Sequence, residues 1–156
     1  MRHKKLSGFT PIEILLVVAA LAILAVLVLT AVNRSRQKAY DNSIRNDVGQ
    51  LRWQAEIVYD DSGANYKGWA KNPPPEIAEQ LRILLEDIDK NYGDPPGEPY
   101  VATIRDTQRK EYCISAPLRS TPDKHYCVDA TAAFKVVSGP CPEEVDKYTP
   151  LRCPSS

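Results

Sequence analysis

The chain lacks, in its amino-terminal third, several features of an ordinary cytosolic globular protein. No cysteine occurs before Cys113, and only one of the thirteen prolines, Pro11, precedes Asn72. No glycine or proline interrupts the segment from Ile12 to Val48. A soluble globule distributes its apolar residues, whereas residues 14 to 29 are apolar without a break although the mean hydropathy is −0.37. The sequence therefore divides into an apolar amino end and a polar remainder.

The chain also has no excess of charge of either sign, because 20 Lys and Arg residues balance 20 Asp and Glu residues. A balanced chain produces no strong overall field that would attract nucleic acid. A length of 156 residues suits one modest domain rather than two full ones.

A run of about nineteen residues from Ile14 to Val32 contains a single polar side chain, Thr30. A helix of that length rises about 28 Å, close to the thickness of the hydrocarbon core of a bilayer. A cleaved secretory signal usually has an apolar core of only about 7 to 15 residues. No Ala-x-Ala motif follows between Thr30 and Arg36. We therefore predict a retained transmembrane helix over residues 9–32 rather than a discarded signal.

Charges flank this segment and also enter it. The segment is preceded by the basic residues Arg2, Lys4 and Lys5, which favour a cytoplasmic amino terminus. It is followed by Arg34, Arg36 and Lys38, which weaken this charge rule for membrane orientation. Glu13 lies just inside the apolar segment, where an ionised carboxylate costs about 3 kcal/mol. The fourteen Ile, Leu and Val residues from Ile12 to Val32 contribute on the order of −6 kcal/mol, so insertion remains favourable. Glu13 is therefore a candidate functional residue, the alternative being a first-turn acid at the membrane interface.

The segment SGFTPIEILL at residues 7–16 resembles the processing site of type IV pilins and of type II secretion pseudopilins. The match covers a short basic leader at 1–8, then Gly8, Phe9, Glu13 and the long apolar stretch. The resemblance implies that prepilin peptidase cuts between Gly8 and Phe9 and methylates the new amine of Phe9. It also implies that Glu13 neutralises the amine of a neighbouring subunit during assembly. The chain's own Phe9 amine is a competing partner at helical spacing, and the sequence leaves both open.

The resemblance implies a structural subunit without enzymatic activity or cofactor, in a type IV pilus or, alternatively, in a type II secretion pseudopilus. Its implied partners are prepilin peptidase, other pilin subunits and the inner-membrane assembly machinery. The implied location is the inner membrane, with a cytoplasmic amino terminus and an extracytoplasmic head, and afterwards a cell-surface filament. Two functions of other classes stay open. One is a membrane-anchored binding module that never polymerises; the other is a tethered hydrolase, for which no nucleophile and base are recognisable beside His125.

An amphipathic pattern continues the apolar run over residues 33–59. Its apolar residues recur every three or four positions, which predicts one buried helix face: Tyr40, Ile44, Val48, Leu51, Ala55 and Val58. Because nothing breaks the helix before Gly49, we predict one continuous helix through both halves. The stripe is expected to cover the core of the head, and a coiled-coil partner is the alternative.

The remaining chain predicts a small α+β head. Residues 60–99 form a connecting segment that opens on turn-forming residues and contains a short helix, whose buried face carries Ile77, Leu81, Leu84, Leu85 and Ile88. Residues 100–156 hold four β-like runs, at 100–104, 111–116, 125–128 and 134–137, with Pro117 and Pro122 bounding a turn between the second and third. The predicted fold is a long amino-terminal helix packed on a small antiparallel sheet, an arrangement that resembles the pilin head.

Four cysteines, Cys113, Cys127, Cys141 and Cys153, predict two disulfides in an exported head. We favour Cys113–Cys127, since these residues lie in predicted neighbouring strands, and Cys141–Cys153, which would close the proline-rich tail. In type IV pilins a disulfide often closes the carboxyl-terminal loop, so the resemblance supports the second pair. A four-cysteine zinc site is the alternative, but no Cys-x-x-Cys spacing occurs.

Two weaker binding sites are also candidates. Asp87, Asp89, Asn91, Gly93 and Glu98 fall at positions 1, 3, 5, 7 and 12 of a calcium-loop pattern, but Tyr92 replaces the required glycine and two prolines intrude. DNA binding is suggested by basic residues interleaved with Tyr112 and Tyr126 and diluted by nearby acids. These basic residues are Arg105, Arg109, Lys110, Arg119 and Lys124, and the acids are Asp106, Glu111 and Asp123.

Overall fold

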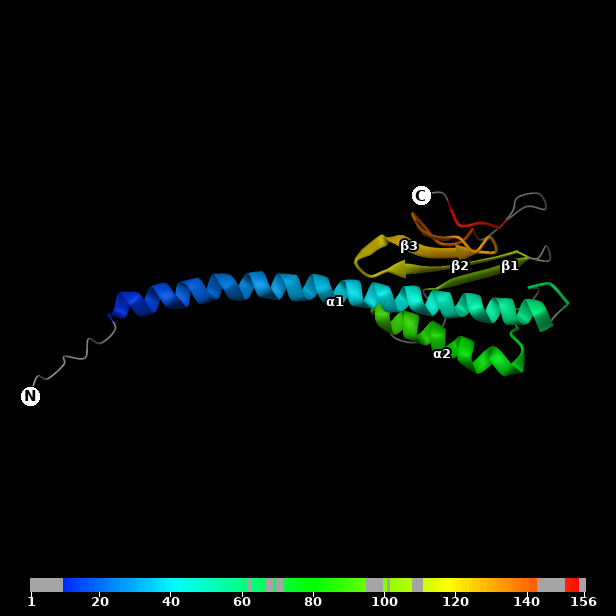
Figure 1. Cartoon of the computed structure of the whole chain (residues 1–156), viewed down its shortest axis with the longest axis horizontal. Coiled ribbons are helices and arrows are strands. Elements are labelled where there is room, and N and C mark those ends of the chain that lie inside the picture. The colour runs from blue at the N-terminus through cyan, green and yellow to red at the C-terminus, as the bar shows by residue number, and fades with distance from the viewer. Residues whose placement is uncertain are drawn as a thin grey trace, which may run out of the picture. The chain divides into compact units, whose positions relative to one another are not determined.

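The computed structural model describes residues 10–61, 63–66, 69, 72–94, 100, 102–107, 111–142 and 151–154. The predicted processing residues Gly8 and Phe9 lie outside this part, as do Glu98, Arg109 and Lys110. The chain forms two compact units, residues 1–36 and residues 37–156. The first helix, α1, contributes to both, so each unit is described by itself (Figure 1).

Helix α1 runs without interruption from Pro11 to Asp61 over 51 residues, which confirms the predicted continuous helix. The predicted turn follows it, since Gly63 and Ala64 both have positive φ values, 69° and 65°. The N–H of Ala64 donates to the carbonyl oxygen of Tyr59 at 2.9 Å, so one of the last carbonyls of the helix is satisfied.

In the second unit, the predicted stripe of α1 is buried from Ile44 to Val58 against helix α2, Pro75–Tyr92, and the sheet, whereas Tyr40 is 36% exposed. The core contains Ile44, Val48, Leu51, Ala55 and Val58 of α1 together with all five predicted apolar residues of α2. Pro75 begins α2, where its missing N–H costs nothing. Gly93, at φ 112°, ends it and donates its N–H to the carbonyl oxygen of Asp89 at 2.9 Å. With 18 residues, α2 is longer than the short helix expected.

The sheet has four antiparallel strands in the order β1-β2-β3-β4: Thr103–Thr107, Glu111–Leu118, Thr121–Asp129 and Phe134–Val137. The predicted antiparallel strands are confirmed, although β1 begins three residues later than the predicted run at 100–104. Strands β2 and β3 are longer than expected, because Pro117 and Pro122 lie inside them rather than bounding the turn. The pairing of β1 with β2 ends at Ser115, so no β1 residue pairs opposite Pro117. A proline has no N–H to donate to a neighbouring strand, so it is tolerated where one side of the strand is unpaired.

The two faces of the sheet cover different parts of the second unit. Successive strand residues point to opposite faces, and in β2 Tyr112, Ile114 and Ala116 belong to the core shared with the helices. Cys113 instead belongs to a second cluster, with Cys141, Leu151 and other residues of the carboxyl-terminal part. Figure 1 shows α1 and α2 near one side of the strands and the tail near the other. The α+β fold class is thereby confirmed.

The turn between β2 and β3 joins both helices. Asp41 of α1 is buried and accepts hydrogen bonds from the N–H of Ser120, at 3.1 Å, and from the Ser120 hydroxyl. Arg119 lies over the ring of Tyr40 at 4.2 Å and donates to the carbonyl oxygen of Asn91 at 3.2 Å. A cation over an aromatic face and a charged donor on a helix carboxyl end are both stabilising. These contacts fix α1, α2 and the sheet as one packed head.

Candidate functional site

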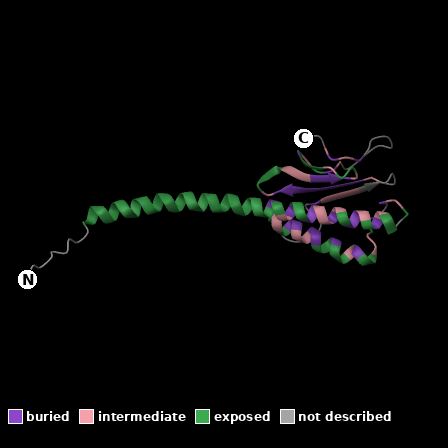
Figure 2. Cartoon of the chain, viewed as in Figure 1, coloured by how far each residue is buried: buried purple, intermediate pink, exposed green. Residues whose placement is uncertain are grey.

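The first unit presents an apolar surface that nothing in the structure covers. Residues 10–36 are all exposed, as the green part of α1 in Figure 2 shows. The fourteen aliphatic side chains from Ile12 to Val32 are between 40% and 68% exposed. Helix α1 contains an 18-residue window with a mean hydropathy of 3.2. By length and composition it is compatible with a single-pass membrane anchor.

Glu13 lies at the amino end of this surface and takes part in a reciprocal hydrogen-bond motif with Thr10. The backbone N–H and the hydroxyl of Thr10 both donate to Glu13 Oε2, each at 2.8 Å. In return, the N–H of Glu13 donates to Thr10 Oγ1 at 3.4 Å. This is a capping box, in which an N-cap Thr and a Glu three residues later satisfy each other's backbone donors.

The capping box was missed at the sequence level, although the pattern Thr10-Pro11-Ile12-Glu13 displays it. Both bonds to the carboxylate end on Oε2, so Oε1 has no hydrogen-bond partner among the residues described. Neutral donors do not cancel the charge of a carboxylate. In an apolar surrounding the ionised group therefore still requires a cation.

The cysteines pair as Cys113–Cys141 and Cys127–Cys153, with Cα–Cα distances of 5.9 Å in both disulfides. The predicted pairs, Cys113–Cys127 and Cys141–Cys153, are therefore wrong. The strand register explains the difference, because Cys113 lies opposite Asp129 and Cys127 lies opposite Ser115. The two strand cysteines are diagonal neighbours on one face of the sheet, and each binds a cysteine of the tail that crosses this face.

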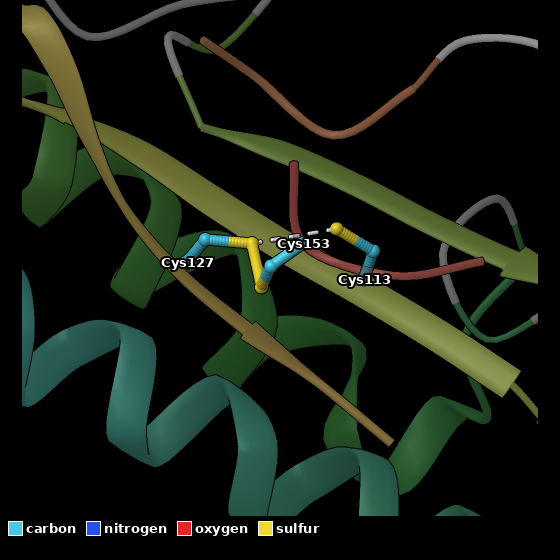
Figure 3. Close-up of side chains that lie close together, drawn as sticks. All are labelled: Cys113, Cys127 and Cys153. Carbon is cyan, nitrogen blue, oxygen red and sulfur yellow. Dashed lines mark hydrogen bonds between the residues drawn. A yellow bond between two sulfur atoms is a disulfide. The ribbon is translucent and has the colours of Figure 1, made fainter. Parts of the chain in front are cut away.

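The strand cysteines are nevertheless close to each other. Cys113 Sγ lies 3.5 Å from Cys127 Sγ, and Figure 3 shows Cys127 bonded to Cys153 beside it. The sulfurs of these three residues lie within 4.8 Å of one another. Sulfurs in disulfides are not thiolates and do not serve as zinc ligands. The oxidised pairing therefore leaves no cysteine free in the structure to bind zinc.

Hydrogen bonds from tail backbone to strand side chains reinforce the two disulfides. The N–H of Cys141 donates to Ser115 Oγ at 2.9 Å, and the N–H of Leu151 donates to Glu111 Oε2 at 2.9 Å. The N–H of Cys153 donates to Asp129 Oδ2 at 3.0 Å. These polar anchors could not be predicted from the sequence, because they depend on which strand face the tail crosses.

Asp129 is the more buried of the two acidic anchors, with 1% of its surface exposed. Burial raises the pKa of its carboxyl, but hydrogen bonds from Thr131 and Cys153 and the charge of Arg152 act in the opposite direction and prevail. The pKa of Asp129 is therefore below its ordinary value. A depressed carboxyl pKa stabilises the fold above the unfolded pKa, and the contribution is lost as the pH falls.

The predicted calcium-binding loop is wrong, because three of its residues lie in a helix. Asp87, Asp89 and Asn91 lie in the last turns of α2, and Asp89 is only 2% exposed. Residues two positions apart on a helix point in nearly opposite directions, so these three cannot surround one ion as loop ligands do. Glu98, the last ligand of the pattern, lies outside the described residues.

The two tyrosines of the DNA candidate lie in different environments. Tyr112 is fully buried and donates its hydroxyl to Glu56, so it cannot stack on a base. Tyr126 is covered by Arg45, and Lys124 donates to Ser138 Oγ at 2.7 Å. His125 is a strand residue in β3, as expected, and burial lowers its pKa.

Comparisons of the chain with family models, with curated proteins and with solved structures found no match.

Tryptic peptide mapping without reduction tests the disulfide pairing, because trypsin places every cysteine on a separate peptide: 111–119, 125–135, 136–147 and 153–156. The expected linked pairs are 111–119 with 136–147 and 125–135 with 153–156. Mass spectrometry of the oxidised protein measures them directly. A linked pair of 111–119 with 125–135 would contradict the structure.

Asp129→Asn should lower the free energy of unfolding by about 1–3 kcal/mol near neutral pH, because buried N–H donors lose a charged acceptor. The difference from the wild type should shrink as the pH falls below the unfolded value near 3.8 and disappear below the lower folded pKa, where the folded wild-type carboxyl is protonated too. Denaturant unfolding of the full chain in detergent at several pH values measures this. Asp123→Asn, an exposed change on the same strand, is the control, expected within about 0.5 kcal/mol. Equal effects of the two variants would refute the role of Asp129.

Proposed function

We propose that the chain is the structural subunit of a type IV pilus, made as a prepilin, cut between Gly8 and Phe9 and assembled through the amino-terminal part of α1. The observation that carries the proposal is Glu13, a carboxylate in the first turn of an exposed helix with fourteen aliphatic side chains. The residues before Glu13 resemble the prepilin processing motif, in which this acid takes part in subunit assembly. The proposal assigns no catalytic activity to the chain.

The exposed apolar surface of α1 supports a function with two successive environments. In the membrane, lipid tails cover these side chains at no cost. A filament outside the membrane must cover them with other subunits, since each large aliphatic side chain left in water forgoes about 1.5–3 kcal/mol. Packing of many copies of α1 side by side satisfies this requirement without any change of fold.

Glu13 would set the position of each helix in such a bundle. Apolar packing alone allows neighbouring helices to slide, because one aliphatic surface is much like the next. A single charge with one acceptable partner, a methylated amine of Phe9, selects one axial position. Oε1, which the capping box leaves without a described donor, is the atom that would accept from this amine.

The two disulfides of the head support an extracytoplasmic location. Two disulfides persist only in an oxidising compartment, and each closes a loop with a sequence separation of 26 or 28 residues. Such a loop stabilises the fold by roughly 3–4 kcal/mol in the chain-entropy model. A type II secretion pseudopilin shares all of these features and is the second candidate, and filament length on cells would separate the two.

Glu13→Ala should leave membrane insertion intact and lower the amount of the chain in sheared filaments at least about tenfold, since losing 1.4 kcal/mol of pairing already costs that factor. Glu13→Gln should behave in the same way, because an amide keeps the size and the hydrogen bonds of the side chain but not its charge. Immunoblots of carbonate-washed membranes and of sheared filaments measure the two quantities.

Two controls separate pairing from helix capping. Glu76→Gln makes the same change at an exposed first-turn acid of α2 and should leave filaments unchanged. Thr10→Ala removes the hydroxyl of the capping box but leaves the charge of Glu13, so assembly should persist. Normal filaments from Glu13→Ala and Glu13→Gln would refute the proposed pairing, and the anchored module that does not polymerise would then be favoured.

A further inference from the structure

Four oxygen-bearing side chains meet where α1 and α2 pack in the head. Ser43 and Asp47 are one turn apart on α1, and Asp87 and Asn91 are one turn apart on α2. Residues four apart share a helix face. Asn91 Nδ2 joins the two pairs, since it donates to Ser43 Oγ at 3.1 Å and to Asp87 Oδ2 at 3.2 Å. These four residues are called the α1–α2 oxygen cluster below.

Asp47 lacks the partners that a buried carboxylate requires. Its side chain is 4% exposed, and its Oδ2 atom is buried without a hydrogen-bond partner. Burial, and after it the negative charge of Asp87, raises the pKa of Asp47 to about 6. The negative charges of Asp47 and Asp87 therefore act on each other, and no described basic side chain forms an ion pair with either carboxylate.

Arg119, which contacts the backbone of Asn91, has other partners. Arg119 lies at the carboxyl end of α2, where it donates to the carbonyl oxygen of Asn91 and covers the ring of Tyr40. Its guanidinium is therefore engaged by other partners. A buried carboxylate without hydrogen bonds or a cation costs several kcal/mol, and a bound cation from solvent would remove this cost.

We propose that the α1–α2 oxygen cluster is a calcium site in which Asp47 and Asp87 supply the charge, and Ser43 and Asn91 supply neutral oxygens. Calcium accepts carboxylate, amide and hydroxyl oxygens together with water in irregular geometry, whereas Mg²⁺ requires a near-octahedral set. Zinc prefers nitrogen and sulfur ligands. A half-turn of the Asn91 amide exchanges its NH₂ group for Oδ1, which then faces the ion.

The cluster differs from the calcium loop suggested by the sequence. It retains Asp87 and Asn91 but replaces Asp89 and Glu98 with two residues of α1 that lie forty or more positions away in the chain. The cluster supplies only two carboxylates, and it is open at Asp87 and Asn91, which are both only partly buried. Calcium binding is therefore expected to be weak. A Kd on the order of 10⁻⁴ to 10⁻³ M, as in extracellular calcium modules, is expected. The site itself does not depend on the proposed filament function.

Thermal unfolding of the full chain in detergent, freed of metal with a chelator and then supplied with calcium, tests the site. At a calcium concentration about ten times Kd, the ratio of folded to unfolded protein should rise about elevenfold, seen as an upward shift of the melting temperature. Calorimetric titration with calcium should show one site per chain, and the same concentration of Mg²⁺ should give a smaller shift.

Asp47→Asn and Asp87→Asn should each abolish the calcium-induced shift, and Asp87→Asn keeps the test valid if the buried variant does not fold. Asp60→Asn, an exposed acid on the same helix, should keep the full shift. No calcium shift in the wild type, or an equal shift in the three variants, would overturn the site. Because filament assembly is not measured here, a negative result would leave the proposed role of Glu13 unaffected.

Discussion

The structure depends first on a single constraint, the placement of one carboxylate at the start of an aliphatic surface that the chain does not cover. Glu13 satisfies part of its requirement locally, through the hydrogen bonds with Thr10, and these bonds also begin the helix. No described residue compensates the charge of Glu13 or covers the exposed surface from Ile12 to Val32. Lipid would cover this surface in the membrane. Neighbouring copies of the same helix would later cover it and pair with the charge of Glu13. Between Ile12 and Val48 this helix contains no glycine or proline, which favours an unbroken helix in both surroundings.

The head meets the opposite demand, since its apolar residues are buried within it. It covers both faces of a four-stranded sheet, one with the helices and one with the tail. The tail has little core of its own, and covalent bonds to Cys113 and Cys127 compensate for this. Buried acids such as Asp41 and Asp129 accept backbone N–H groups of loops and tail. The polar anchors thereby fix segments that hydrophobic burial alone would not hold.

Much of this fold could be predicted from periodicity and from turn residues. The spacing of the apolar residues in α1 and α2 identified the buried faces, because a helix repeats every 3.6 residues wherever it packs. The disulfide pairing could not be predicted, because it depends on whether Cys113 lies opposite Cys127 or two residues away from it. The cluster around Asp47 was also invisible, since only the packing of two helices brings its members together. The capping box was visible in the sequence and was overlooked.

The mature amino terminus of the chain isolated from its native cells tests the central claim most directly. Intact-protein and peptide mass spectrometry should find a chain that begins at Phe9 with a methylated amine, because only that cleavage creates the cation that Glu13 requires. A chain that begins at Met1 would have no such amine beside Glu13. A chain that begins beyond Val32 would have lost the apolar helix altogether. Either result would contradict the proposed assembly through Glu13.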